Sequence, residues 1–354
     1  MRRLLLWATA IVLLLALVAG AAGWLAWQRL QQPFKGYTKP RQRLVIAEGA
    51  SARRILAELE EQGVIADARL ARLYLIHVLD DPPLQAGEYR FEGELTTPQA
   101  LDRLIRGDVV RHAVTVVEGR TLEQTAQALA ATGLVSAEAL LAAMRRPERI
   151  RDLDPEAEDL EGYLFPDTYH FTRNTDAETM VDTMVDTFRR RLEEEVLPRI
   201  SEVPAPPPRE LVTLASLVES EAAVDGERGV IAGVYRNRLD RGIALYADPT
   251  VIFALRRAGR WDGNLTRSDL QFDSPYNTYR YSGLPPGPIC SPGLASLQAA
   301  AQPADVPFLY FVSRNDGTHV FAETLSEHNR NVARWQKEYW RRERQATAEP
   351  GGSD

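Results

Sequence analysis

Residues 211–221 read LVTLASLVESE, and this stretch predicts a helix that ends in a carboxylate on its apolar face. Leu214, Leu217 and Val218 follow the spacing i, i+3 and i+4 of one helical face, and the next position of that face is Glu221. A carboxylate among leucines loses hydration, which disfavours its charged form, so we expect a raised pKa and a candidate general acid. The alternative is an amphipathic helix whose last Glu reaches solvent or pairs with an Arg.

The same helix carries a second carboxylate, Glu219, for which we expect a different purpose. It lies about 160° around the helix from Glu221 at 3.6 residues per turn. Thr213, Ser216 and Ser220 also face away from the apolar side. The spacing therefore favours Glu221 as the catalytic acid and leaves Glu219 as a supporting residue or a charge on the helix surface.

Residues 1–28 predict a transmembrane anchor. No charged residue occurs from Leu4 to Trp27, and at 1.5 Å per residue this run is about 36 Å long, enough to cross a hydrocarbon core. The small residues 19–21 resemble a signal cleavage site, but the apolar run continues to Trp27, whose ring suits a membrane interface. We therefore expect an uncleaved anchor, with the long C-terminal part translocated, rather than a cleaved signal.

Composition and charge exclude several classes of partner and cofactor. The formal net charge of −7 over 354 residues argues against nucleic acid as a partner. Cys290 is the only cysteine, so an internal disulfide and a thiolate metal cluster are excluded, and we expect a small buried side chain. His319 and His328 have no third ligand at metal spacing, so we take them as structural or substrate-contacting. Without a phosphate loop or nucleotide fingerprint, we predict neither a metal nor a cofactor.

The N-terminal half of the chain matches itself at an offset of 70 residues. Glu48, Gly49, Ser51, Leu59, Gly63 and Leu70 recur as Glu118, Gly119, Thr121, Leu129, Gly133 and Leu140. Each copy has a β-rich run (43–46 and 113–117), a Gly turn, a Ser or Thr that can cap a helix, and a helix that ends at a Gly. The pattern therefore predicts two related units.

A shared Tyr-x-Phe sequence ends each unit. Tyr89 and Phe91 recur as Tyr169 and Phe171, now at an offset of 80, so the second copy contains about ten additional residues. Each copy thus predicts a strand, two helices and a strand, which is a small α+β module. Such modules serve packing alone or bind sugars, and these residues leave both open.

The C-terminal half begins after a Pro-rich connector at 203–208. We expect a helix at 227–239, a hairpin of 308–312 and 319–321 around Asn315, Asp316 and Gly317, and a terminal helix at 326–344. The intervening stretch is rich in Pro and Gly but also contains Tyr and Asn, which is typical of the loops of a binding groove.

Several motifs resemble the endolytic murein transglycosylase family, also called the YceG-like family. They occur in the family's order and cover most of the chain, so together they are specific although each alone is weak. The matching stretches are LEGYLFPDTY at 160–169, LASLVESEA at 214–222, VYRNRL at 234–239, ADPTV at 247–251, SPYNTY at 274–279, GLPPGPI at 283–289 and HVFAETLSEHN at 319–329.

The resemblance implies an α+β fold behind an N-terminal transmembrane helix. Residues 1–28 would form the anchor and 41–112 a LysM-like βααβ module. Residues 113–344 would form the α+β catalytic region, in which 113–171 is a second related module. The remaining residues, 345–354, are expected to be a disordered tail.

The family's activity implies a lytic transglycosylase that acts on peptidoglycan. Such an enzyme cleaves the β-1,4 bond from N-acetylmuramic acid to N-acetylglucosamine within nascent glycan strands, leaves 1,6-anhydro-N-acetylmuramic acid ends and so ends strand elongation. The resemblance places it in the bacterial inner membrane with its catalytic domain in the periplasm. Its implied partners are glycan strands, the membrane and peptidoglycan synthases.

The resemblance also implies the site residues. Glu221 would protonate the leaving oxygen and then accept the proton of the muramic acid C6 hydroxyl. Glu219 matches the motif as a supporting, substrate-binding residue. The other implied groove residues, without individual roles, are Glu161, Asn237, Asp248, Tyr276, Asn277 and Thr278; Asp248 also suits a turn before Pro249.

Two other functions are compatible with the sequence. A hydrolytic muramidase would use Glu221 with Glu219 or Asp248 as its second carboxylate. A non-catalytic scaffold would bind glycan and recruit wall-synthesis enzymes. Such a protein should have lost its catalytic acid, so the presence of Glu221 counts against this function.

Overall fold

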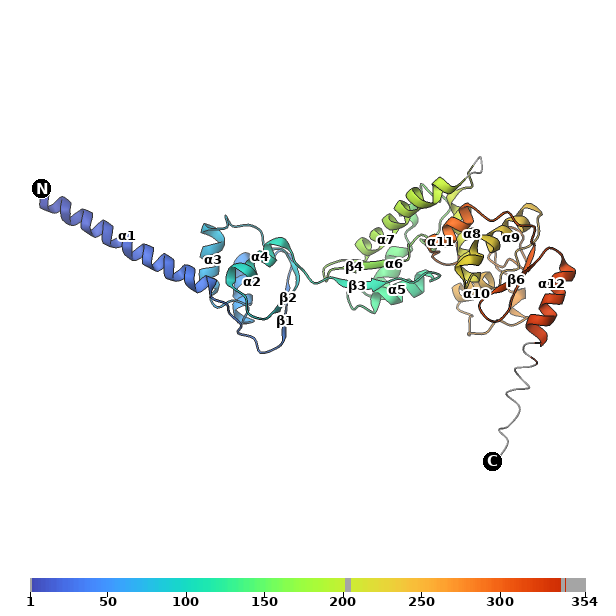
Figure 1. Ribbon diagram of the computed structural model, residues 1–354, viewed down its shortest axis with the longest axis horizontal. Helices are drawn as coiled ribbons and strands as arrows, with labels where there is room; N and C mark the ends of the chain where they lie inside the picture. Colours follow the sequence, from blue (N-terminus) through green and yellow to red (C-terminus); the bar gives the residue numbers. More distant parts are fainter. Residues whose placement is uncertain (1, 201–204, 339–340, 342–354) are drawn as a thin grey trace, which may run out of the picture. The chain divides into compact units, whose positions relative to one another are not determined.

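The computed structural model describes residues 2–200, 205–338 and 341, and its chain divides into two compact units. Unit 1 comprises residues 1–112 and 170–174, and unit 2 comprises 113–169 and 175–354. The first two residues of the predicted connector (203–204), the end of the predicted terminal helix and the predicted tail at 345–354 lie outside the described residues. Helices and short strands alternate in both units (Figure 1), as the predicted α+β class requires.

Unit 1 begins with the long helix α1 (Arg2–Gln31) and continues with β1 (Arg41–Ile46), α2 (Ala52–Glu61), α3 (Ala68–His77), β2 (Gly87–Glu92) and α4 (Thr97–Arg106). Strands β1 and β2 are antiparallel, with Leu44 opposite Tyr89. Every second residue of β1 is buried, and these side chains pack with the apolar faces of α2, α3 and α4.

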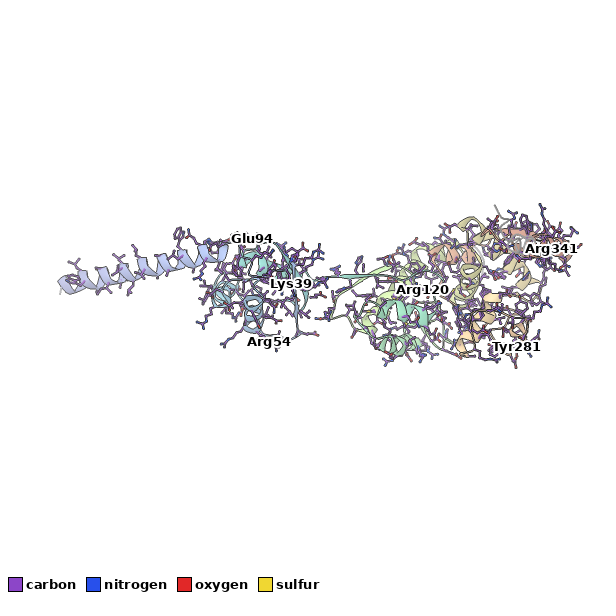
Figure 2. All side chains as sticks on the ribbon, turned by 90° about the horizontal axis from the view of Figure 1, so that it is seen from below. Lys39, Arg54, Glu94, Arg120, Tyr281 and Arg341 are labelled. Atoms are coloured by element: carbon purple, nitrogen blue, oxygen red, sulfur yellow. The ribbon has the colours of Figure 1, made fainter. Side chains whose placement is uncertain are left out.

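Helix α1 is the part of unit 1 that could cross a membrane. Residues 6–31 are long and apolar enough, and the side chains of its apolar stretch are exposed along the helix (Figure 2). Only its C-terminal end packs onto the unit, where Leu30 is buried and the ring centroid of Trp27 lies 5.9 Å from that of Tyr74. An uncovered apolar helix of this length suggests a single-pass membrane anchor.

Unit 2 contains the remaining elements. They are β3 (His112–Thr115, whose first residue belongs to unit 1), α5 (Leu122–Ala130), α6 (Ala137–Met144), β4 (Thr168–Phe171, whose last two residues belong to unit 1), α7 (Ala177–Arg191), α8 (Pro208–Glu221), α9 (Arg228–Asp240), α10 (Asp248–Arg257), α11 (Leu294–Ala301), β5 (Tyr310–Ser313), β6 (His319–Ala322) and α12 (Leu325–Val332). Strands β3 and β4 pair, as do β5 and β6. The hairpin and the helix at 227–239 therefore form where the sequence predicts them.

The two copies of the repeat share local geometry. Gly49 and Gly119 have φ of +73° and +74°, a backbone conformation that glycine adopts without strain. In the next turn, Ser51 and Thr121 each accept a hydrogen bond from the backbone N–H three residues on. The predicted order of strand, helix, helix and strand occurs in both copies.

The second strand of each copy carries the same tyrosine contact. The hydroxyl of Tyr89 donates to the carbonyl of Gln85 at 2.8 Å, and that of Tyr169 donates to the carbonyl of Phe165 at 2.6 Å. Both tyrosines are buried. Equivalent residues thus make equivalent contacts, while the likeness of these modules to LysM domains stays a prediction.

Candidate active site

Helix α8 carries Glu221 as its last residue. Pro208 begins the helix, where a missing N–H has no cost. Residues 211–218 are buried on all sides because α9, α10 and α11 surround the helix. The expected polar side was therefore wrong for Thr213 and Ser216, which are fully buried. Ser216 instead donates to the carbonyl of Thr213 and accepts from the N–H of Ile289 at 3.1 Å.

The environment of Glu221 favours a protonated carboxyl near neutral pH. Burial raises its pKa to about 7, and the negative charge of Asp248 adds to the rise. The hydroxyl of Tyr235 donates to Glu221 Oε1 at 3.2 Å and, with the positive charge of Arg238, opposes it. The carboxyl also ends a helix, where the dipole disfavours negative charge. A group poised in this way can both deliver and recover a proton at neutral pH.

Glu221 lines a cavity of about 640 Å³ in unit 2. The hairpin β5–β6 and helix α12 form one side of this Glu221 cavity, and the ends of α8, α9 and α10 contribute to the other. Its polar lining residues are Glu221, Arg238, Tyr246, Asp248, Tyr279, Tyr310, Ser313, His319 and His328. This combination of one acid, aromatic rings and hydroxyl groups suits a saccharide ligand.

Asp248 is the second carboxylate of the Glu221 cavity. It is the first residue of α10, and its Oδ1 accepts a hydrogen bond from the hydroxyl of Tyr279 at 2.5 Å. Asn277 donates to the carbonyls of Leu270 and Phe272 at 3.1 and 2.7 Å. The buried Asn277 thereby holds the loop that presents Tyr279, two residues on.

Thr278 fixes the same loop to α10. Its hydroxyl accepts from the N–H of Ala247 at 3.0 Å and bonds the hydroxyl of Thr250 at 3.0 Å. Thr278 and Asn277 are buried and bonded to the protein itself. The structure therefore places both behind the Glu221 cavity, and their direct contact with substrate stays a prediction.

Glu219 faces away from the Glu221 cavity, as the helical spacing predicts. Its Oε2 accepts the N–H of Gly293, at the start of α11, at 3.0 Å. Its Oε1 lies 3.5 Å from the guanidinium of Arg228, the first residue of α9. Burial and the charge of Glu219 together raise the pKa of nearby Glu118. Glu219 thus joins α8 to α9 and α11, and no described contact connects it to Glu221.

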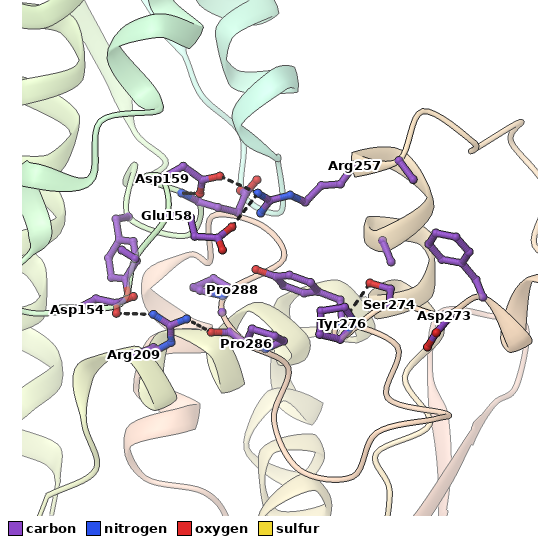
Figure 3. A pocket seen from close by; sticks show the side chains of 18 residues that line it. Asp154, Glu158, Asp159, Arg209, Arg257, Asp273, Ser274, Tyr276, Pro286 and Pro288 are labelled. Atoms are coloured by element: carbon purple, nitrogen blue, oxygen red, sulfur yellow. Dashed lines mark hydrogen bonds and ion pairs between the residues drawn. The ribbon is translucent and has the colours of Figure 1, made fainter.

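Glu161 and Tyr276 lie in a different hollow, of about 390 Å³ (Figure 3). Both arginines of this hollow pair with carboxylates that also line it: Arg209 with Asp154 at 2.5 Å, and Arg257 with Asp159 at 3.3 Å. Arg209 lies in the first turn of α8, 12 residues before Glu221, so the hollow lies about 18 Å along α8 from Glu221. Substrate contact by these two residues stays a prediction.

The buried Glu161 also has a structural partner. Its Oε2 accepts the N–H of Leu122, at the start of α5, at 3.2 Å, whereas its Oε1 has no partner among the described residues. Burial raises its pKa well above the usual value. Asn237, in α9, donates to the carbonyls of Val306 and Phe308 at 2.6 and 3.0 Å and lines neither space. Of the eight predicted residues, the Glu221 cavity unites only Glu221 and Asp248.

Arg238 lines the Glu221 cavity and Tyr235 donates a hydrogen bond to Glu221, but neither residue was singled out from the sequence. Tyr235 and Arg238 belong to the motif VYRNRL, and their i, i+3 spacing on α9 gives them a common face that excludes Asn237. This spacing was an available signal. His319 and His328, which the sequence left as structural or substrate-contacting, both line the Glu221 cavity. Cys290 is buried as predicted, and burial raises the pKa of its thiol.

The chain is similar to known proteins along most of its length. The model of a family described as YceG-like matches residues 44–334. The endolytic murein transglycosylase of Bacillus subtilis (strain 168) is 32% identical over 337 residues, covering 89% of this chain and 90% of that protein. Its namesake from Streptococcus pneumoniae serotype 2 (strain D39) is 30% identical, and the match covers 81% of this chain but 57% of that longer protein.

A solved structure is also similar. The crystal structure of a YceG-like protein from Listeria monocytogenes is 31% identical in sequence. The match covers 83% of this chain and 99% of that one, with a TM-score of 0.54. Sequence and fold therefore point to the same family.

Proposed function

Because this chain belongs to the YceG-like family, we propose that it is an endolytic lytic transglycosylase of peptidoglycan. Relatives named endolytic murein transglycosylase support a peptidoglycan transglycosylase role. The observation that carries the proposal is the carboxyl of Glu221, with a pKa raised to about 7, in a cavity with room for sugar rings. We propose that it acts on the β-1,4 bond from N-acetylmuramic acid to N-acetylglucosamine.

Glu221 supplies the acid for cleavage. Its carboxyl proton passes to the glycosidic oxygen as the bond from C1 of the muramic acid to that oxygen breaks. The muramic acid's own C6 hydroxyl then bonds to C1, and its proton restores the Glu221 carboxyl. No water is consumed, so the products are a free N-acetylglucosamine hydroxyl and a 1,6-anhydro end. One carboxyl suffices because the nucleophile belongs to the substrate.

The presence of Asp248 in the Glu221 cavity is the observation that favours one alternative function, a hydrolytic muramidase. Hydrolysis by an inverting or retaining route needs a second carboxylate at the scissile bond. Asp248 lines the Glu221 cavity, whereas Glu219 is bonded to Gly293 and Arg228 elsewhere. If the protein is a muramidase, Asp248 is therefore its second carboxylate.

The mass of the products separates these reactions. We expect purified protein to convert uncross-linked glycan strands into fragments that end in anhydro-muramic acid, one water lighter than hydrolytic products. Mass spectrometry before and after borohydride reduction provides the measurement, since an anhydro end cannot be reduced. Reducible muramic acid ends would instead establish hydrolysis. Unchanged strands, beside complete digestion by a known muramidase, would favour the glycan-binding scaffold.

We further propose that α1 anchors the protein in the bacterial inner membrane, with both units on the periplasmic side. An active site outside the cytoplasm would meet nascent strands there, beside the peptidoglycan synthases that make them, and would end their elongation. Alkaline phosphatase fused after Asp354 should be active, and the chain should sediment with membranes. An inactive fusion, or a soluble product that begins near Ala22, would contradict the anchor and its orientation.

A further inference from the structure

His319 is held in one orientation by Glu227. Glu227 Oε1 accepts the backbone N–H of His319 at 3.0 Å, and its Oε2 lies 2.7 Å from His319 Nδ1. A carboxylate only accepts hydrogen bonds, so Nδ1 carries the proton of the neutral ring. The remaining nitrogen, Nε2, is then a hydrogen-bond acceptor and a base.

Aromatic side chains fix the plane of the same ring. The centroid of Phe311 lies 5.3 Å from that of His319 at an interplanar angle of 88°, and Phe321 packs at 6.4 Å. The residue is 9% exposed and lines the Glu221 cavity. Its Nε2 has no hydrogen-bond partner within the described ranges 2–200, 205–338 and 341. A rigidly oriented base without a protein partner is typical of a group that meets a substrate.

From this geometry we propose that His319 is a second catalytic residue, a base that takes the proton of the muramic acid C6 hydroxyl and passes it back to Glu221. The inference rests on the proposed transglycosylase function. The C6 oxygen bonds to C1 as its proton moves to Nε2. The resulting imidazolium then gives that proton to the Glu221 carboxylate, so the enzyme returns to its starting state. Glu227 keeps the ring in the required tautomer and is a positioning residue.

The location of the groups explains why a second base helps. Glu221 must serve the leaving oxygen, which departs with the N-acetylglucosamine, whereas the C6 hydroxyl belongs to the muramic acid on the other side of the broken bond. Arg238 and Asp248 also line the Glu221 cavity. The guanidinium of Arg238 donates to the carbonyls of Leu309 and Leu245 and accepts no proton. Asp248 already accepts the hydrogen bond of the Tyr279 hydroxyl. His328 stacks on Tyr310, with ring centroids 5.2 Å apart and its Nδ1 buried. Of these two cavity histidines, His319 is the one whose ring a carboxylate, that of Glu227, orients.

Chemical rescue tests the proposal on the full-length protein. His319→Ala should lower the rate of product formation by roughly 10²-fold or more, the usual contribution of a general base. Added imidazole should restore the rate at least about tenfold, because it occupies the vacated space and supplies a basic nitrogen. Pyrrole is the matched control: it has the same shape and an N–H for Glu227 but no basic nitrogen, so it should restore nothing. Equal rescue by both rings, or rescue by neither, would overturn the proposal.

Two more variants keep the test decisive if the alanine protein folds poorly. His319→Gln offers an acceptor but cannot take up a proton as a base, so it should be as impaired as His319→Ala with an unchanged thermal melt; near wild-type turnover would refute the proton transfer. Glu227→Gln can donate to Nδ1 and so reverse the tautomer. Glu227→Gln alone should lower activity, but adding it to His319→Ala should cause no further loss. If the losses of the two substitutions add independently, Glu227 does not act through His319. The product mass of the wild type tests the function itself, separately from these rates.

Discussion

Glu221→Gln should remove nearly all transglycosylase activity and leave the fold intact. Gln has the size of Glu and can accept the hydrogen bond that Tyr235 now donates at 3.2 Å, but it cannot deliver a proton. General acid catalysis contributes roughly 10²- to 10⁴-fold, and we expect a loss at the upper end because both proton transfers of the cycle involve this carboxyl. The measurement is the rate of anhydro-product formation on uncross-linked glycan strands, with thermal melts as the folding control.

Glu219→Gln is the matched control on the same helix. It makes the same chemical change two residues away, on the side that faces Gly293 and Arg228. We expect some loss of stability, since a buried ion pair loses a partner, and a much smaller loss of activity. An inactive Glu219→Gln beside an active Glu221→Gln would show that the wrong carboxylate was chosen. If both variants turn over like the wild type, a single-acid mechanism is excluded.

Helical spacing predicted much of this part of the site. The separation of Glu219 from Glu221 follows from 3.6 residues per turn, and their different surroundings agree with it. The same periodicity applied to VYRNRL would have selected Tyr235 and Arg238 rather than Asn237. Helical spacing wrongly placed Thr213 and Ser216 on a polar face, because a helix enclosed on every side has no face toward solvent. The local sequence does not reveal how many elements surround a helix.

The rest of the Glu221 cavity depends on contacts between distant residues. His319 begins β6 and Glu227 precedes α9, so nothing in their separate sequences pairs them. The burial of Asn277 and Thr278 likewise results from packing of their loop on α10. The motif stretches contain residues of the Glu221 cavity, but which side chain of each stretch lines the cavity is decided by tertiary packing, which a single sequence does not specify.

Glu221→Gln should also stabilise the protein, by an amount that grows with pH. The pKa of Glu221 is raised from 4.5 to about 7 on folding. Between these values the native state keeps a proton that the unfolded chain has lost, so the wild type loses stability as pH rises through this range. The shift corresponds to at most about 3 kcal/mol above pH 7, and partial exposure of the side chain reduces that figure.

Gln carries no charge at any pH, so the variant escapes this loss. Denaturation of both proteins in the same detergent should give nearly equal stabilities at the acid end of the range and a widening advantage for Glu221→Gln up to neutral pH, with no further change beyond. Glu219→Gln is the matched control, because it removes the carboxylate that contacts Arg228 and should therefore bring no such advantage. A constant difference at every pH would mean that Glu221 titrates like an ordinary surface carboxylate. The group would then be ionised at neutral pH, and its proposed role as the acid would fail with the stability trend.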